Sequence, residues 1–103
     1  MFHHVVLFRW RADASESQKM AVSQGLADLP DLIDSLRAYR FGPDAHISDG
    51  TWDFAVLAEF DDQAGYLAYR DHPAHKEVVA DRIAPIVSDR ASVQSQFETG
   101  VSY

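Results

Sequence analysis

The sequence predicts an α+β fold in which helices cover one face of a four-stranded antiparallel sheet. Three observations support this prediction. Strand-like and helix-like segments alternate in the order β-α-β-β-α-β, the first and third strand segments are apolar on both faces, and 103 residues suffice for one modest core. This order is the split β-α-β arrangement of ferredoxin-like folds. We therefore expect one domain over residues 1–103.

The first strand is expected over Phe2–Trp10, a run of β-branched and aromatic residues that is short for a helix. Its even-numbered residues share one face, so His4 is a polar group within an apolar row. A helix is expected to start at Ser15, because Gln18 three positions later completes a capping-box pattern. The same helix is expected to end at Pro30.

Three further strands follow from alternation and turn chemistry. The second is expected over Leu36–Phe41, since Gly42-Pro43-Asp44 stops it. The clearest is Trp52–Phe60, which should lie centrally beside the first strand, and the last is expected over Ser88–Phe97. A lone sheet with both faces apolar would expose a hydrophobic patch, and a twofold dimer of facing sheets would cover it.

The stretch Tyr69-Arg-Asp-His72-Pro73-Ala-His75 concentrates the chemistry of the chain. A helix should stop near Asp71 or His72, because the residue before a proline leaves the α region. A second helix can begin at Pro73, where the missing N–H has no partner to lose. His75 then lies in the first turn, where the helix dipole disfavours its imidazolium. We expect a neutral ring that can accept a proton.

The charge balance restricts the partners. Sixteen acidic against nine basic residues give a formal net charge of −7, so neither nucleic acid nor an anionic membrane is an expected partner. Small organic molecules and a second copy of the chain fit better. The absence of cysteine excludes disulfides, thiolate metal sites and a cysteine nucleophile. No apolar run approaches the roughly 20 residues that span a bilayer, and no signal peptide is recognisable. A cytoplasmic location is expected.

A metal site is the alternative use of the histidines. His72 and His75, with His3 and His4 upstream, are residues of the commonest metal-ligating type. The proline between the first two disrupts regular helical presentation, and no carboxylate pair completes a site. We therefore expect neither a metal nor a cofactor. His46 is expected to be an exposed loop histidine.

Four segments together resemble the stress-responsive dimeric α/β-barrel (Dabb) domain family. They are His4-Val-Val-Leu-Phe-Arg, Phe41-Gly42-Pro43, the strand Trp52–Phe60 and, above all, the Tyr-x-x-His-Pro-x-His pattern from Tyr69 to His75. The resemblance covers nearly the whole chain. It implies a homodimer whose two sheets close into a barrel, with a small-molecule cavity in each subunit between sheet and helices.

Within that family the layout is similar to that of the olivetolic acid cyclases, which are polyketide cyclases. The resemblance implies that His75 is the general base of an aldol-type reaction and that Tyr69 stabilises an enolate oxygen. It implies that His4 lines the pocket, and His72 is a further expected substrate-binding residue. Phe54 replaces a pocket histidine of the cyclase, so the substrate end differs, and a carbonyl compound is the implied class.

Two functions therefore follow from the sequence. The first is a cofactor-free enzyme that acts on a carbonyl-containing organic molecule through His75 and Tyr69. The second is a non-catalytic ligand-binding or stress-response dimer, in which the turn before and after Pro73 fixes the helix break and a pocket wall. In the second case Tyr69 packs its ring against the sheet and His75 is hydrogen-bonded at the turn.

Overall fold

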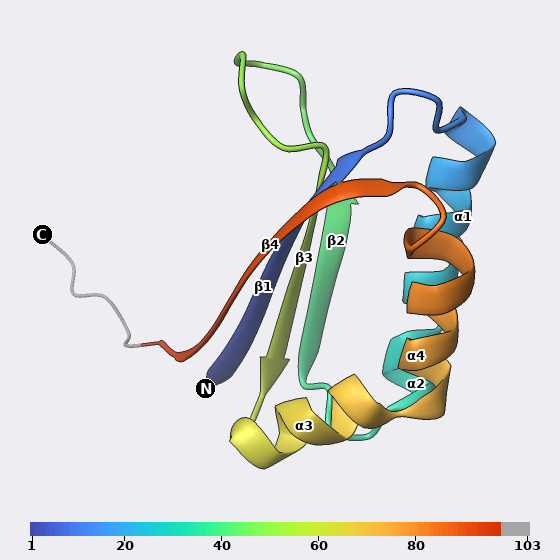
Figure 1. Cartoon of the computed structure of the whole chain (residues 1–103). Coiled ribbons are helices and arrows are strands. Elements are labelled where there is room, and N and C mark those ends of the chain that lie inside the picture. Colours follow the sequence, from blue (N-terminus) through green and yellow to red (C-terminus); the bar gives the residue numbers. More distant parts are fainter. Residues whose placement is uncertain (98–103) are drawn as a thin grey trace, which may run out of the picture.

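A computed structural model describes residues 1–97 of the protein (Figure 1). Four strands form one antiparallel sheet in the order β2-β3-β1-β4. Their bounds are β1 (Phe2–Trp10), β2 (Ala38–Pro43), β3 (Phe54–Phe60) and β4 (Val87–Gln96). β1 pairs with both β3 and β4, so it is central, as is β3. The predicted ferredoxin-like fold is confirmed, with strand ends shifted by no more than two residues.

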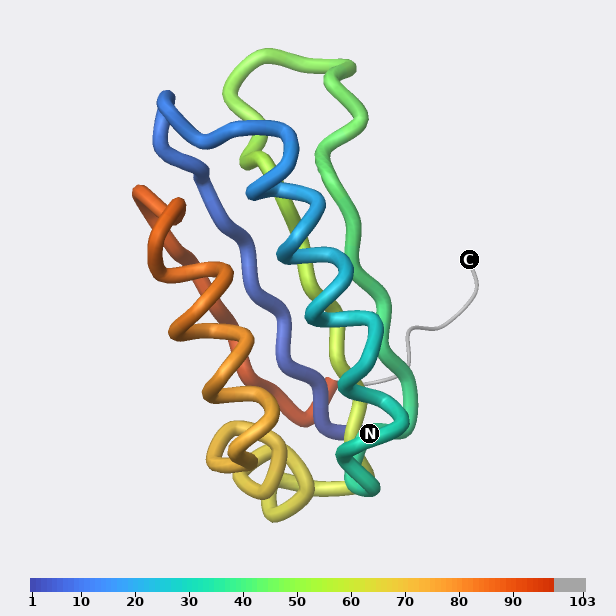
Figure 2. The backbone as a smooth tube through the Cα atoms, turned by 90° about the vertical axis from the view of Figure 1, so that its right-hand side faces the viewer, coloured from blue at the N-terminus to red at the C-terminus, as the bar shows by residue number. Residues whose placement is uncertain are grey.

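The helices lie on one face of the sheet (Figure 1). Seen from that side, α1 and the α4–η1 segment run next to each other along the length of the sheet (Figure 2). The bounds are α1 (Glu16–Ala27), α2 (Leu29–Leu32), α3 (Gln63–Asp71), α4 (Pro73–Val78) and the π-helix η1 (Val79–Ile83). No helix among residues 1–97 combines the length and the apolar character that crossing a membrane requires.

The start of the first helix is confirmed and its predicted end is wrong. Gln18 N–H donates to Ser15 Oγ over 3.1 Å, and Ser15 N–H donates to Gln18 Oε1 over 2.9 Å, which completes the capping box. The helix ends at Ala27 and not at Pro30. Pro30 lies in the first turn of the short helix α2, a position that needs no N–H.

The core lies between the sheet and the helices. Even-numbered residues of β1 and β3 face the helices and are mostly buried, including Phe8, Val56 and Phe60, which pack with Leu26 and Ile83 from the helical layer. The odd-numbered residues lie on the opposite face. In the described part of the chain no helix covers that face.

We call this uncovered surface the open face. Its apolar residues come from three strands, and two of them are strongly exposed, Leu57 at 42% and Val93 at 56%. Its members are Val5, Leu7, Ala55, Leu57, Ala91 and Val93. The apolar surface that the sequence predicts on the second side of the sheet is therefore present.

Candidate functional site

The helix break forms at His72, as predicted. α3 ends at Asp71, His72 is extended with φ −66° and ψ 134°, and α4 begins at Pro73. The His72 N–H donates to the Tyr69 carbonyl over 3.2 Å. Its side-chain Nδ1 accepts the Ala74 N–H over 3.0 Å. His72 thus closes one helix with its backbone and caps the next with its side chain.

Tyr69 and His75 meet across this break. Their ring centroids are 4.2 Å apart, and Tyr69 is only 2% exposed. His75 Nδ1 lies 3.1 Å from the carbonyl oxygen of Arg70. Because a carbonyl only accepts, Nδ1 carries the proton and the lone pair is on Nε2. The backbone therefore fixes the tautomer that leaves Nε2 as a proton acceptor.

Burial is the main reason why His75 is neutral. It lowers the pKa of His75 below the ordinary histidine value, the Arg90 charge lowers it further, and the bond to the Arg70 carbonyl opposes both. The lowered pKa of His75 agrees with the neutral ring that the sequence predicts. Burial is the leading cause of the shift, whereas the sequence analysis gave the helix dipole as the cause.

His4 approaches the same pair of rings from β1. It is 4% exposed, and its ring centroid lies 4.9 Å from that of Tyr66 and 6.3 Å from that of Tyr69. Gln94 Nε2 donates to His4 Nδ1 over 3.0 Å, so the proton of the neutral ring is on Nε2. Burial, followed by the charges of Arg90 and His75, lowers the pKa of His4 to about 4.

Tyr39 is a member of the cluster that the sequence analysis missed. Its hydroxyl lies 2.8 Å from the hydroxyl of Tyr69. Two phenols carry two protons and this bond uses one, so the other is free to be donated. Burial raises the pKa of Tyr69 to about 12 and raises that of Tyr39 well above its usual value. Both hydroxyls are therefore protonated donors at neutral pH.

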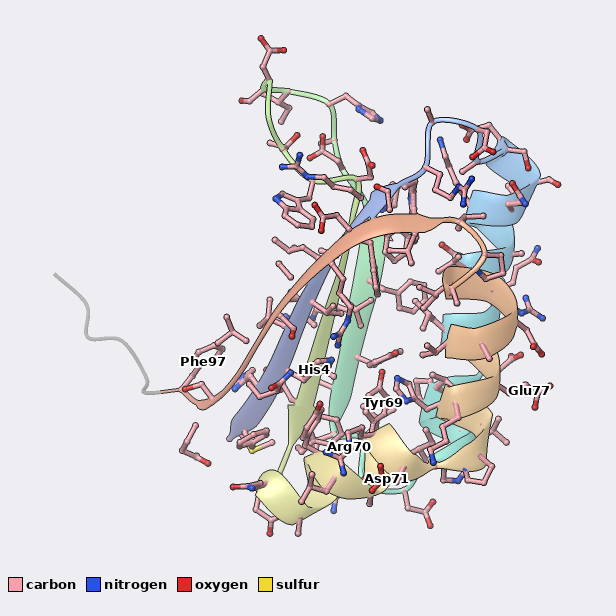
Figure 3. All side chains as sticks on the ribbon, viewed as in Figure 1. His4, Tyr69, Arg70, Asp71, Glu77 and Phe97 are labelled. Atoms are coloured by element: carbon pink, nitrogen blue, oxygen red, sulfur yellow. The ribbon has the colours of Figure 1, made fainter. Side chains whose placement is uncertain are left out.

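Three of the five predicted site residues thus come together. His4 and Tyr69 lie between the sheet and the helices in Figure 3, on β1 and α3 respectively, and His75 contacts Tyr69. His72 is adjacent but uses its side chain as a helix cap. We name the converging residues, His4, Tyr39, Tyr69 and His75, the ring cluster.

Phe54 lies away from the ring cluster. It pairs with Phe8, whereas His4 pairs with Ala58 four residues along the same strand. Phe54 lines a groove of about 390 Å³ at the other end of the sheet, together with apolar and charged residues that include Trp10, Lys19, Met20 and His46. This hollow and the ring cluster are therefore separate features.

The remaining histidines lie elsewhere. His3 Nε2 pairs with Glu59 Oε1 at 3.0 Å on the open-face side, and His46 lies in the exposed loop between β2 and β3. Across residues 1–97, no three histidine, aspartate or glutamate side chains are grouped so that they could hold a metal ion.

Comparison with known proteins gives one family. The family model described as Stress responsive A/B Barrel Domain (Dabb) matches residues 2–97. A stress-response A/B barrel domain-containing protein of Arabidopsis thaliana is 26% identical, and the match covers 91% of this chain and 90% of that protein.

Solved structures share the fold. A dimeric ferredoxin-like protein from Thermobifida fusca is 40% identical with a TM-score of 0.85, over 91% of this chain and 88% of its own. The hydroxynitrile lyase from Passiflora edulis is 15% identical with a TM-score of 0.83, over 98% of this chain and 96% of its own. The second likeness is one of fold alone.

Proposed function

The chain belongs to the stress-responsive A/B barrel (Dabb) domain family, and from this premise we propose a cofactor-free acid–base enzyme acting on a small carbonyl compound. The observation that carries the proposal is the pairing of His75 with Tyr69. A proton-accepting Nε2, fixed by the Arg70 carbonyl, belongs to a ring 4.2 Å from that of a buried phenol. A base beside a donor is the arrangement that proton abstraction next to a carbonyl needs.

The chemistry follows from these protonation states. His75 Nε2 takes a proton from the carbon next to the carbonyl and becomes an imidazolium. The electron pair left behind moves onto the carbonyl oxygen, where the Tyr69 O–H stabilises the negative charge, supported by Tyr39. His4 offers its Nε2–H as a further donor. The resulting enolate can attack a second carbonyl, which is an aldol-type ring closure.

A polyketide-like substrate is the finer form of this proposal. It rests on the similarity to the olivetolic acid cyclases at Tyr69, His75 and His4, and Phe54 marks a difference at the substrate end. The hydroxynitrile lyase from Passiflora edulis supports the view that this fold can carry an enzyme, but it transfers no residue role to this chain.

Proton exchange tests the proposal without knowledge of the natural substrate. The probe is acetophenone in deuterated buffer, with loss of its α-proton signal followed by NMR. We expect the protein to accelerate exchange, and His75→Gln and Tyr69→Phe to slow it by roughly 100-fold or more. Lys76→Gln, on an exposed side chain of the same helix, is the control and should change nothing. Equal rates in wild type and both site variants would contradict the proposal.

A specific observation favours the second function, a non-catalytic ligand-binding dimer. Both histidines of the turn bond to backbone groups, His72 to Ala74 and His75 to Arg70. If the two histidines serve only to make these backbone hydrogen bonds, His72→Ala should lower the free energy of unfolding. His75→Ala should then leave the affinity for the ligand unchanged. Binding of acetophenone measured by NMR shifts, with no exchange in any variant, would favour this function.

We also propose that the protein is a homodimer. The Thermobifida fusca relative is described as dimeric and is 40% identical. The open face provides a self-complementary apolar surface, since a twofold axis sets the same strands against each other. Face-to-face closure would produce the barrel that the family description names.

A further inference from the structure

Arg90 lies on the edge strand β4, on the same strand as Gln94, which bonds to His4 of the ring cluster. The register of β4 sets Arg90 opposite Phe8 and Gln94 opposite His4. The even-numbered residues of β1 face the helices, so their partners on β4 share that side of the sheet. Arg90, Ser92 and Gln94 therefore form one polar row on the helix side, and Gln94 already bonds to His4.

This row is open to solvent and carries a positive charge. Arg90, Ser92 and Gln94 are all exposed. Within residues 1–97, the guanidinium of Arg90 takes part in none of the salt bridges, which involve Arg11, Arg37 and Arg70 among the arginines. In a chain with 16 acidic and nine basic residues, an arginine without a carboxylate partner is available to an external anion.

The charge of Arg90 reaches the ring cluster. It contributes to the lowered pKa of His4 and of His75, and it works against the raised pKa of Tyr69. These three side chains come from three different elements, so the charge of Arg90 acts on more than one member of the cluster. A cation at this point also favours any negative charge that develops on a ligand bound there.

We propose that Arg90 binds the carboxylate of the ligand, so that the site takes organic anions that carry a carbonyl group, such as keto acids. This inference deepens the acid–base function proposed above and rests on it for the role of the carbonyl. Arginine holds a carboxylate through two parallel hydrogen bonds, which orients the ligand as well as retaining it.

The strand geometry indicates the shape of that ligand. Arg90 and Gln94 are four positions apart on β4, a distance of roughly 14 Å between their backbones at about 3.4 Å per residue. The long arginine side chain can shorten this distance by several ångströms. We therefore expect a ligand with its carboxylate a few bonds from its ketone to contact Arg90 at one end and the ring cluster near His4 at the other.

A matched pair of probes tests the charge requirement. They are 3-benzoylpropionate and its methyl ester, which share the aryl ketone and differ in charge. We expect wild type to bind the acid at least roughly tenfold more tightly than the ester in NMR or calorimetric titrations. Arg90→Gln should bring the ratio close to one, and Arg90→Lys should keep part of it, because a lysine retains the charge without the planar fork.

Arg11→Gln is the control variant, since Arg11 is exposed, follows the last residue of β1 and already pairs with Asp13. It should keep the full preference for the acid. Circular dichroism and urea unfolding check that both Arg90 variants are folded. A wild type without preference for the acid, including one that binds neither probe at millimolar concentration, overturns the inference. So does an unchanged ratio in Arg90→Gln.

The outcome separates the two proposals. If Arg90→Gln loses the preference while His75→Gln exchanges protons at the wild-type rate, the anion site stands and the acid–base function fails. If His75→Gln loses exchange while Arg90→Gln keeps the preference, the reverse holds. The ratio of acid to ester binding would not change if Arg90 merely supported the fold of β4.

Discussion

The two histidines of the ring cluster are held in opposite tautomers. The Arg70 carbonyl keeps the proton of His75 on Nδ1, whereas the Gln94 amide keeps the proton of His4 on Nε2. One ring therefore offers a lone pair and the other a donor, and both are neutral near pH 7. The ring cluster therefore acquires charge only when a proton is transferred. At that point the tyrosine O–H groups can stabilise the negative charge that develops on the substrate oxygen.

His4 should make stability depend on pH. The unfolded chain binds a proton on this residue near pH 6.5 and the folded chain only near pH 4, so the unfolded state holds more protons between these values. The free energy of unfolding should fall as pH drops from 7 to 5, by about 2 kcal/mol from His4 alone. Urea unfolding at both values measures it. His4→Gln should show a correspondingly smaller fall, and an equal fall in both proteins would contradict the prediction.

The phenol pair gives a second prediction at this scale. Tyr39→Phe removes the only side-chain hydrogen bond that Tyr69 makes within the described residues and leaves a buried hydroxyl without its partner. We expect a loss of about 1 to 2 kcal/mol in urea unfolding and a further rise in the pKa of Tyr69, because the bond now lowers it. Tyr66→Phe is the control on the same helix. Equal stability of the two variants would show that the pair contributes nothing.

The sequence indicated part of this site, and the reason is local. Tyr69 and His75 flank a proline within seven residues, so their proximity follows from one helix break. Tyr39 gave no such signal, because its bond joins β2 to α3 across 30 residues. Phe54 was expected at the substrate end of the pocket, but its distance from the helix break depends on strand register, which a single sequence does not specify.

At the scale of elements, the π-helix explains a spacing that an α-helix does not accommodate. Val78 and Ile83 are both buried although they are five residues apart. Five residues of α-helix would turn the second one away from the core, whereas the wider π turn brings it back. The Ala84 N–H donates to the Val79 carbonyl over 2.8 Å, the i+5 bond of that turn. The sequence predicts a helix from Pro73 without this insertion, because periodicity alone does not reveal it.

The cap of α4 can be tested separately from the chemistry. His72→Ala removes the ring nitrogen that accepts the Ala74 N–H, and we expect a loss of about 1 kcal/mol in the free energy of unfolding. Lys76→Ala in the same helix is exposed and should change stability little. Thermal or urea unfolding measures both variants. If His72→Ala is as stable as Lys76→Ala, the side chain is not an energetically significant cap.

At the scale of the molecule, the site and the proposed dimer interface lie on opposite sides of one sheet. Along β1, the buried His4 points to the helices, while Val5 and Leu7 point to the open face. The central strand β1 thus contributes His4 to the ring cluster from one face and Val5 and Leu7 to the proposed interface from the other. Association can stiffen the strands without contributing a side chain to the cluster. A monomeric variant should therefore keep the ring cluster intact.

Leu57→Asp is the sharpest test of the homodimer. Leu57 is 42% exposed in the single chain and lies on β3 within the open face. A twofold interface contains Leu57 twice. The substitution therefore removes the burial of two leucine side chains, each of which contributes about 1.5 to 3 kcal/mol to association, and it places two carboxylates in the interface. We expect the wild type to sediment as a dimer at micromolar concentration and the variant as a monomer, a weakening of at least roughly 100-fold. Leu32→Asp, at a 54% exposed leucine of α2, should remain dimeric. A monomeric wild type, or a Leu57→Asp variant that stays dimeric, would show that the open face is not the interface.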